Sequence, residues 1–424
     1  MAIARVPPAV HNAPFRILFV CAYLPAVGMS GGATRMFHII RGASAQHAVS
    51  VLCYRDTEEE LRYVAELEAI CERVEVIERG QSLDDWVRDP LHLVPRSVSL
   101  EFGNPRMRRR VAQELSSGRY DIAQFEFLDV AYLLPRRVAL PTILTHIEVV
   151  SRVMAQRVQA AASPLSKLSL VTQWVRALHF EVAMSKRFTT NVFLTANEAG
   201  SITRYAPDVA SAISHLGVDC TYFQPMQGRV TPGSMVYVGY FRHVPNVDAV
   251  MYFCESVLPH IWATQPNATF TIVGGAAPDN VRSLARDPRI RVLGWVDDYR
   301  PYLDAAQLIV APVISGAGMR TKIIEAWAMG KPVVATPLAV EGCGAIHEQN
   351  ALIAAGPESI ARCVLQVLSD SALGERLGQS ARMTAERSYD WGVITREHDR
   401  IYRDTLDRFW QSPRSYSADN GDAC

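Results

Sequence analysis

Short apolar runs recur along the chain, and the longer stretches between them place apolar residues at helical spacing. This alternation is typical of parallel sheets built from βαβ units. Several runs are continuously apolar, as expected for strands that helices cover on both faces. In the first half we expect strands at residues 15–23, 49–54, 74–77, 121–125, 142–146, 191–195 and 213–216.

The same pattern begins again in the second half, so the sequence predicts a second lobe. Strands are expected at residues 235–239, 269–273, 291–293, 308–311, 333–335 and 351–353. Helices are expected at residues 248–261, 322–329, 359–368 and 372–386. A chain of 424 residues suits two domains of this kind better than one.

A polar stretch from Asp219 to Gly233, rich in proline and glycine, separates the two patterns and is typical of a linker. We therefore expect an α/β protein with a Rossmann-like N-terminal domain over 1–222 and a second one over 223–392. An amphipathic helix over 393–410 follows. The polar tail, 411–424, is expected to be disordered.

Charge and cysteine usage narrow the classes of function. The 43 Lys and Arg residues balance 43 Asp and Glu residues, so no global field attracts nucleic acid, and none is expected as a partner. The eight cysteines are scattered, without a C-x-x-C pair or a Cys/His cluster at zinc spacing. No signal-peptide core and no apolar run of about 20 residues is present. We expect a cytoplasmic protein that could lie at the inner face of a membrane.

A glycine pair, Gly31 and Gly32, follows the first expected strand and directly precedes a helical run. Glycines let a ligand approach the backbone, and the helix N-terminus offers free N–H groups and the positive end of the helix dipole. A phosphate or a sugar hydroxyl would suit this place. The G-x-G-x-x-G spacing is missing, which disfavours NAD. A plain β–α turn explains the pair equally well.

The stretch from Pro312 to Pro332 carries a stronger signal, because its loop leads into a helix with two cations in the first turn, Arg320 and Lys322. Cations there oppose the helix dipole by about a few tenths of a kcal/mol. An anion bound between them would offset this. The alternative is a solvated contact between Lys322 and Glu325, one turn apart.

The twelve residues from Glu325 to Thr336 resemble the segment E-A-(M/W)-A-x-G-x-P-V-V-A-(S/T) of family 4 retaining glycosyltransferases, which have the GT-B fold. Further matches follow in the family's order, at residues 215–225, 236–239, 245–246, 270–275, 292–297 and 389–391. The loop pattern G-x-G-M-R-x-K resembles the branch linked to exopolysaccharide loci. The resemblance implies two Rossmann-like lobes, a donor cleft between them, and a final helix that crosses back to the first lobe.

The resemblance also implies roles for individual residues. Glu325 matches the second glutamate of the E-x7-E motif, which binds the donor ribose. His146 matches a histidine that faces the reacting sugar, although a strand-end histidine is otherwise more often a structural hydrogen-bonding group. The implied donor-binding residues are Gly31, Gly32, Gly239, Arg242, Gly274, Gly294, Trp295, Val296, Gly316, Ala317, Gly318, Met319, Thr321 and Glu325.

The chain departs from the family at two places. Ala317 stands where the first glutamate of E-x7-E is expected, and Tyr240 and Asn246 stand where an arginine and a lysine are usual. We therefore predict that Arg320 and Lys322 supply the cations that neutralise the donor diphosphate. With His146, they form the predicted catalytic set.

The predicted reaction is transfer of a glycosyl group, with retention, from a nucleoside diphosphate sugar to a saccharide, lipid-linked or other hydroxyl acceptor in surface polysaccharide or glycoconjugate biosynthesis. No carboxylate pair suits the scheme of the hydrolases, so catalysis would rest on positioning and leaving-group stabilisation. Neither a metal nor a cofactor beyond the donor is expected. Two alternatives stay open: a catalytically degenerate nucleotide-sugar-binding subunit, and a UDP-sugar epimerase of the same fold.

Two basic segments suggest how a lipid-linked acceptor could be reached. Arg106 to Arg110 is a dense basic run, and the segment from Ser151 to Phe188 mixes basic residues with leucine and tryptophan. Either segment could lie on an anionic membrane face. A solvated face backed by ordinary core explains the same pattern equally well.

Overall fold

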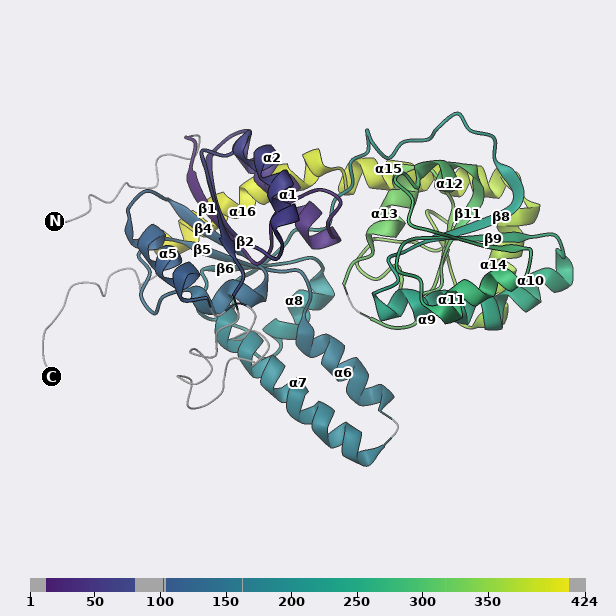
Figure 1. Ribbon diagram of the computed structural model, residues 1–424, viewed down its shortest axis with the longest axis horizontal. Coiled ribbons are helices and arrows are strands. Elements are labelled where there is room, and N and C mark those ends of the chain that lie inside the picture. Colours follow the sequence, from purple (N-terminus) through teal and green to yellow (C-terminus); the bar gives the residue numbers. More distant parts are fainter. Residues whose placement is uncertain (1–12, 81–101, 103, 162, 317, 412–424) are drawn as a thin grey trace, which may run out of the picture. The chain divides into compact units, whose positions relative to one another are not determined.

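The computed structural model describes residues 13–80, 102, 104–161, 163–316 and 318–411. The chain divides into an N-terminal unit, Met1–Ser214 with Ile394–Cys424, and a C-terminal unit, His215–Val393. Each unit contains one parallel sheet flanked by helices (Figure 1). The predicted α/β architecture of two Rossmann-like lobes is therefore confirmed.

The N-terminal unit has a seven-stranded parallel sheet of order β3-β2-β1-β4-β5-β6-β7. Its central strands are buried along almost their whole length, which agrees with their continuous apolar runs. The strands are β1 (Arg16–Cys21), β2 (Ala48–Arg55), β3 (Arg73–Glu78), β4 (Ile122–Glu126), β5 (Thr142–His146), β6 (Thr190–Phe193) and β7 (Ser211–Ile213).

Helices α1, α5, α7 and α8 of the N-terminal unit each begin at a polar side chain that caps them. Ser30 caps α1 by accepting from the backbone N–H of Ala33 at 3.1 Å, and Ser163 caps the longest helix of this segment, α7. The helices of this unit are α1 (Gly31–Ser44), η1 (Glu58–Tyr63), α2 (Val64–Glu68), α5 (Pro105–Ser116), η2 (Leu128–Leu133), α6 (Val150–Ala160), α7 (Pro164–Ser185) and α8 (Ala196–Thr203).

The C-terminal unit has a six-stranded parallel sheet of order β10-β9-β8-β11-β12-β13. Its strands are β8 (Thr231–Val238), β9 (Thr269–Val273), β10 (Ile290–Gly294), β11 (Ala306–Ala311), β12 (Val333–Ala335) and β13 (Leu352–Ile353). Its helices are α9 (Val244–Tyr252), η3 (Phe253–Val257), α10 (Leu258–Thr264), α11 (Asp279–Ser283), η4 (Leu284–Arg286), α12 (Arg300–Ala305), α13 (Thr321–Ala328), α14 (Pro357–Ser369) and α15 (Ser371–Ser388).

The helix expected at 248–261 differs from the observed one in two respects. It begins earlier, at Val244, with Pro245 in the first turn, where its missing N–H is harmless. It also contains a π-helical turn, η3, directly before α10. Pro259 lies in the first turn of α10 and cannot donate to a carbonyl of the preceding turn, so the widened turn lets the helix continue.

The boundary between the units lies after Ser214, and not at 222/223 as expected. The backbone N–H of Val218 donates to Tyr389 O at 2.7 Å, and Trp391 N–H donates to Val218 O at 3.2 Å. A side chain at Gly217 would meet the Trp391 ring at 2.5 Å. These long-range contacts tie residues 215–222 to the C-terminal unit, and no local signal announces them.

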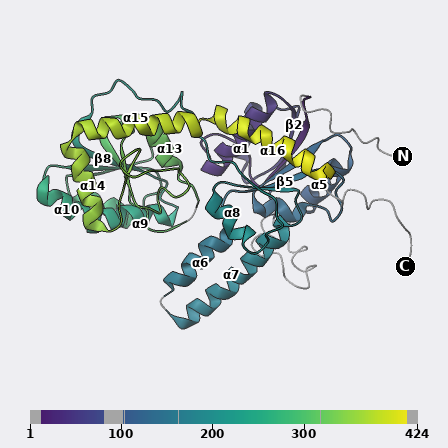
Figure 2. The same cartoon turned by 180° about the vertical axis from the view of Figure 1, so that it is seen from behind.

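The final helix, α16 (Trp391–Gln411), leaves the C-terminal unit and belongs to the N-terminal one from Ile394 onward (Figure 2). There Asp399 pairs with His47 at 2.8 Å, and Thr405 donates to the Thr190 hydroxyl at 2.9 Å. The implied crossing helix is thus present. Of the tail expected to be disordered, Gln411 ends α16, and residues 412–424 lie outside the described residues. Among the helices that the structure describes, none is long and apolar enough to cross a membrane.

A buried polar network joins α1, β4 and α16 inside the N-terminal unit. The Arg35 guanidinium and the Glu126 carboxylate are fully buried and 3.4 Å apart. Arg35 also donates to the Ser214 hydroxyl at 3.2 Å, and His398 on α16 hydrogen-bonds the same hydroxyl at 3.1 Å. Burial raises the pKa of Glu126, and the Arg35 cation opposes that rise. The network fixes α1, whose first residues are Gly31 and Gly32.

Removing one partner of this pair should destabilise the N-terminal unit strongly. Glu126→Ala leaves a buried guanidinium without its carboxylate, so we expect the free energy of unfolding to fall by about 3–5 kcal/mol in urea titrations. The double variant Arg35→Met with Glu126→Leu should lose less, because an apolar pair needs no ionic partner. As a matched control, Asp121→Ala breaks the exposed pair with Arg16 and should lose about 1 kcal/mol or less. A similarly small loss for Glu126→Ala would contradict the prediction.

Candidate functional site

Three glycines bring the carboxyl ends of β8, β9 and β10 together. Gly274 has a φ of 145°, and a Cβ at this position would lie 1.8 Å from the Gly239 carbonyl oxygen. Its N–H donates to Gly294 O at 2.9 Å. A larger residue at Gly274 would therefore force the strand ends apart. This edge of a parallel sheet is where ligands bind in open α/β folds.

Two large aromatic side chains lie exposed at the same edge. Trp295 follows Gly294 and is 70% exposed, and Tyr240 follows Gly239 and is 50% exposed. Trp295 contacts the backbone at Gly275, where an added Cβ would meet its ring at 3.3 Å. Val296 is half-buried, and Arg242, in the turn before α9, is exposed. The edge thus presents an aromatic surface beside open backbone.

The loop between β11 and α13 has the backbone that its glycines predict. Gly316 and Gly318 have φ values of 95° and 80°, in the region that favours glycine. Met319 is buried, and the Arg320 guanidinium turns back to donate to the Gly318 carbonyl. α13 then begins at Thr321. Ala317, the position of the missing glutamate, lies outside the described residues.

The Lys322 ammonium lies at the centre of a contact between three elements. From the first turn of α13, it donates to the Tyr237 hydroxyl on β8 at 2.7 Å and to the Asn246 side-chain oxygen on α9 at 2.8 Å. It also lies 4.0 Å from the centre of the Tyr237 ring. The Asn246 amide nitrogen donates in turn to the Tyr240 carbonyl at 2.8 Å. The ammonium therefore points toward Asn246 and is not held in a solvated contact with Glu325.

Burial lowers the pKa of Lys322 to about 7, with the nearby Arg320 cation adding to the fall and the Glu325 carboxylate opposing it. Burial likewise raises the pKa of Glu325, while a hydrogen bond from Tyr299 and the charge of Lys322 lower it. These charged groups thus lie together, partly buried, at the start of α13. Such a place favours an anion, because a new negative charge would stabilise both cations.

His146 lies at the end of β5, as predicted, but it is fully buried. Its Nε2 is 3.1 Å from the Asn191 side-chain oxygen, and its ring stacks on Phe193 at 4.5 Å. Burial lowers its pKa to about 4, so the ring is neutral at physiological pH. Its Nδ1 has no hydrogen-bond partner among the described residues. This is the environment of a structural histidine, and its contact with a reacting sugar stays a prediction.

The glycine pair at the start of α1 lies against Phe127, a residue that the sequence analysis did not single out. A Cβ on Gly32 would meet the Phe127 ring at 2.5 Å, so only glycine lets the ring pack there. Phe127 itself has a φ of 79°, which is unfavourable for a bulky residue and often marks a functional place. Gly31 is exposed beside it. Nothing in the local sequence signals this conformation.

The predicted residues thus fall into two groups within separate units. The C-terminal unit brings Lys322, Arg320 and Glu325 together on α13, near the Gly239–Gly274 contact. The N-terminal unit holds Gly31 and Gly32, with His146 in its core. Tyr237 and Tyr299 were missed by sequence reasoning, although a tyrosine near the end of an apolar strand is a weak hint of a polar partner. No cluster of His, Cys, Asp or Glu able to hold a metal ion occurs among the described residues.

A family model, curated relatives and solved structures are similar to this chain. Residues 232–370 match the family model of glycosyl transferases group 1. The lipopolysaccharide core biosynthesis glycosyltransferase LpsE of Rhizobium meliloti (strain 1021) is 31% identical over 140 residues, which are 31% of this chain and 41% of that protein. A phosphatidyl-myo-inositol mannosyltransferase of Mycobacterium leprae (strain TN) is 32% identical over 151 residues, 34% of this chain and 40% of that protein.

The matches to curated relatives span less than half of those proteins, whereas similar solved structures cover almost the whole chain. The structure of Anabaena Alr3699/HepE in complex with UDP has a TM-score of 0.67 at 14% identity, over 92% of this chain and 100% of that one. At this identity the similarity shows the fold. Residues 232–370 are therefore similar to the glycosyl transferases group 1 family, within a chain that has the GT-B fold.

Proposed function

We propose that this protein transfers a glycosyl group, with retention of configuration, from a nucleoside diphosphate sugar to a saccharide, lipid-linked or other hydroxyl acceptor. The group 1 family match over residues 232–370 supports the transferase class. The complex of HepE with UDP supports a uridine nucleotide as the donor. The names of LpsE and of the mannosyltransferase support an acceptor in glycoconjugate biosynthesis.

The position of the Lys322 ammonium carries this proposal. In the family that the sequence resembles, a lysine usually stands where this chain has Asn246. Here the Lys322 ammonium lies 2.8 Å from the Asn246 side-chain oxygen. A short amide side chain and one hydrogen bond together have a reach comparable to that of a lysine side chain. A cation is thus kept at about the same place, although it comes from α13 and not from α9.

In the proposed reaction the bond between the anomeric carbon and the leaving diphosphate oxygen breaks, and the acceptor oxygen bonds to the same face of that carbon. The acceptor proton passes to the leaving diphosphate, so no enzymic nucleophile is required. Lys322 and Arg320 would stabilise the negative charge that develops on the leaving group. The N–H groups of the Gly316–Gly318 loop and of the first turn of α13 would add to this. Glu325, held by Tyr299, would accept from the donor ribose hydroxyls.

Turnover separates this proposal from a degenerate nucleotide-sugar binder. Purified protein should release nucleoside diphosphate from one member of a panel of UDP-, GDP- and ADP-sugars when saccharide or lipid-extract acceptors are added. NMR of the product should show the anomeric configuration of the donor. Binding of a nucleotide sugar without turnover under any of these conditions would leave only the binding function.

Lys322→Ala should weaken UDP binding by about 10- to 100-fold in isothermal titration calorimetry, because a charge-assisted hydrogen bond to the diphosphate is lost. The double variant Lys322→Ala with Asn246→Lys returns an ammonium from α9 and should regain much of this affinity. Lys167→Ala, an exposed lysine on α7, is the matched control and should bind UDP like wild type. UDP affinity within about twofold of wild type in Lys322→Ala would refute the role given to this residue.

UDP affinity should also depend on pH through Lys322. Its pKa is about 7 in the free protein, and a bound diphosphate would raise it, so binding takes up a proton above neutral pH. Affinity should therefore fall from about pH 7 to about pH 9, by up to about tenfold per pH unit. His243, whose pKa is lowered by burial and by Lys322 and Arg320, is neutral in this range.

Lys322→Arg is the control for this pH dependence, because arginine stays charged throughout the range. Its profile should be flat where that of wild type falls. A flat wild-type profile, or the same slope in Lys322→Arg, would assign the pH dependence elsewhere and contradict the prediction.

A further inference from the structure

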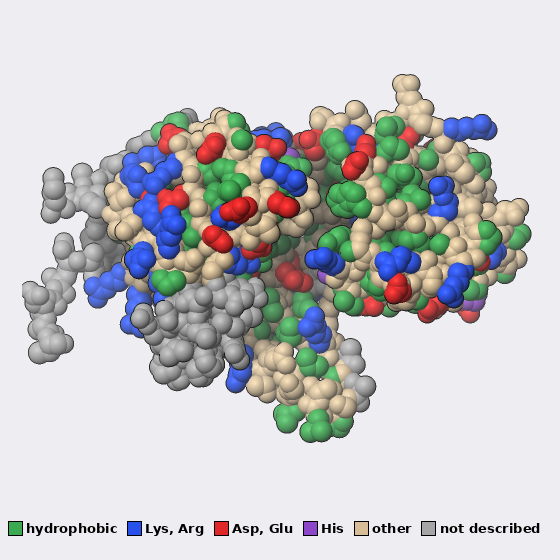
Figure 3. Space-filling view, in the orientation of Figure 1, with side chains coloured by type: hydrophobic (Ala, Val, Ile, Leu, Met, Phe, Trp, Pro, Cys, Tyr) green, Lys and Arg blue, Asp and Glu red, His purple; other side chains and the backbone are tan. Residues whose placement is uncertain are grey.

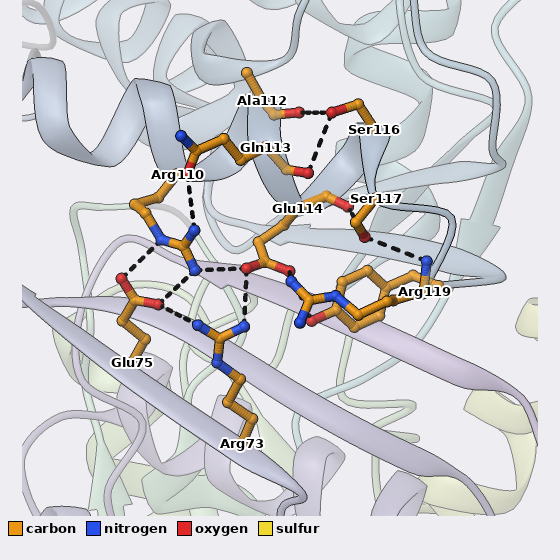
Figure 4. Close-up of polar contacts among 10 residues, drawn as sticks. Arg73, Glu75, Arg110, Ala112, Gln113, Glu114, Ser116, Ser117 and Arg119 are labelled. Carbon is orange, nitrogen blue, oxygen red and sulfur yellow. Dashed lines mark hydrogen bonds and ion pairs between the residues drawn. The ribbon is translucent and has the colours of Figure 1, made fainter.

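One arginine of the basic run on α5, Arg110, lies in a network of ion pairs with neighbouring carboxylates (Figure 4). Arg110 donates to Glu75 at 2.8 Å and to Glu114 at 2.5 Å. Arg119 donates to the second oxygen of Glu114 at 2.6 Å. The pKa of Glu75 is lowered chiefly by its hydrogen bond with Arg110, as expected for a carboxylate that stays ionised in such a network. Arg110 is thus engaged within the N-terminal unit, whereas Arg106 and Arg109 of the same run are exposed.

The hairpin formed by α6 and α7 differs, because its outer part has no core of its own. The two helices project side by side from the N-terminal unit (Figures 1 and 2). From Arg152 to His179, no residue whose exposure is described is buried. The buried residues of α7 lie in its last turns, at Phe180, Glu181 and Ser185. The outer hairpin is therefore stabilised by little more than the contact between its two helices.

The outward face of α7 carries an apolar stripe. Leu165, Leu168 and Val175 are 83%, 67% and 51% exposed. With Thr172, they follow the i, i+3, i+7, i+10 spacing of one helix face. An amphipathic helix usually packs such a stripe against the core. A stripe that faces solvent therefore indicates a surface that contacts a membrane or another protein. The two leucines lie nearest to the connection between the helices, at the tip of the hairpin.

The charged residues on the outer part of the hairpin, between Glu148 and Glu181, are all of one sign. Between Glu148 and Glu181 the sequence contains no aspartate or glutamate, but it contains Arg152, Arg157, Lys167 and Arg176. The space-filling view shows hydrophobic and basic side chains on the hairpin (Figure 3). A protein partner would usually present charges of both signs, whereas an anionic bilayer offers one sign everywhere and an apolar interior beneath it.

We infer that the tip of the α6–α7 hairpin docks onto an anionic lipid surface, with Leu165 and Leu168 entering the interface and Lys167 and Arg176 meeting lipid phosphates. The apolar stripe supplies burial, and the cations supply attraction that depends on lipid charge. The inference goes beyond the proposed transfer reaction, because it uses none of the residues given to the donor. UDP binding and lipid binding can therefore succeed or fail independently.

Co-sedimentation of the full chain with vesicles tests the inference. Wild-type protein should sediment with vesicles of phosphatidylcholine and phosphatidylglycerol and should stay in solution with phosphatidylcholine alone. Raising the salt from about 0.1 M to about 0.5 M should weaken binding, because the lipid charge is screened. Leu165→Ser with Leu168→Ser should lower the bound fraction by about tenfold or more, since the apolar contribution is lost.

Two matched controls should bind like wild type. Met383→Ser removes a side chain on α15 that is 62% exposed, and Arg106→Ser with Arg109→Ser removes exposed cations of α5. Circular dichroism and UDP affinity should be unchanged in all variants, which excludes unfolding as the cause of a loss. Absence of wild-type binding at low salt would overturn the inference, as would equal binding by the leucine variant. A dimer in light scattering that the leucine variant abolishes would assign the hairpin to a second copy of the chain instead.

Discussion

One ammonium group, that of Lys322, connects three segments of the C-terminal unit at the proposed donor site. Lys322 reaches from α13 to Tyr237 on β8 and to Asn246 on α9, so three segments far apart in sequence meet on a single cation. Placing a lysine in the first turn of a helix is unfavourable, and burying it is more so. A bound anion would offset both unfavourable effects, because it would stabilise the charged form of Lys322. The tyrosine and the asparagine then hold the lysine while no anion is bound.

The N-terminal unit binds most of α16, a helix that begins in the C-terminal unit. Arg35 and Glu126 form a buried pair, and Ser214 and His398 extend it to α16 within the same unit. The same network orients α1, with its glycine pair. In each unit, therefore, a cation with internal partners fixes the helix that follows the glycine-rich turn: Arg35 on Glu126, and Lys322 on Tyr237 and Asn246.

Much of the fold could be predicted because it is local. Buried parallel strands are continuous apolar runs, and the glycines at 316 and 318 have the backbone that such a loop needs. The features that could not be predicted are set by contacts distant in sequence. Nothing around Val218 indicates that it pairs with Tyr389, and nothing around His146 indicates that Asn191 and Phe193 enclose it. The sequence shows that Asn246 stands where a lysine is usual. Only the structure shows that the Lys322 ammonium lies beside Asn246 and so places a cation there.

We propose that Lys322 supplies, for a donor diphosphate, the cation that a lysine at the position of Asn246 would otherwise provide. A crystal structure of the protein with UDP tests this most directly. We expect the Lys322 nitrogen to lie within about 3 Å of a diphosphate oxygen, beside the N-terminus of α13. UDP bound with its diphosphate distant from Lys322, and with the ammonium still on Tyr237 and Asn246 alone, would contradict it.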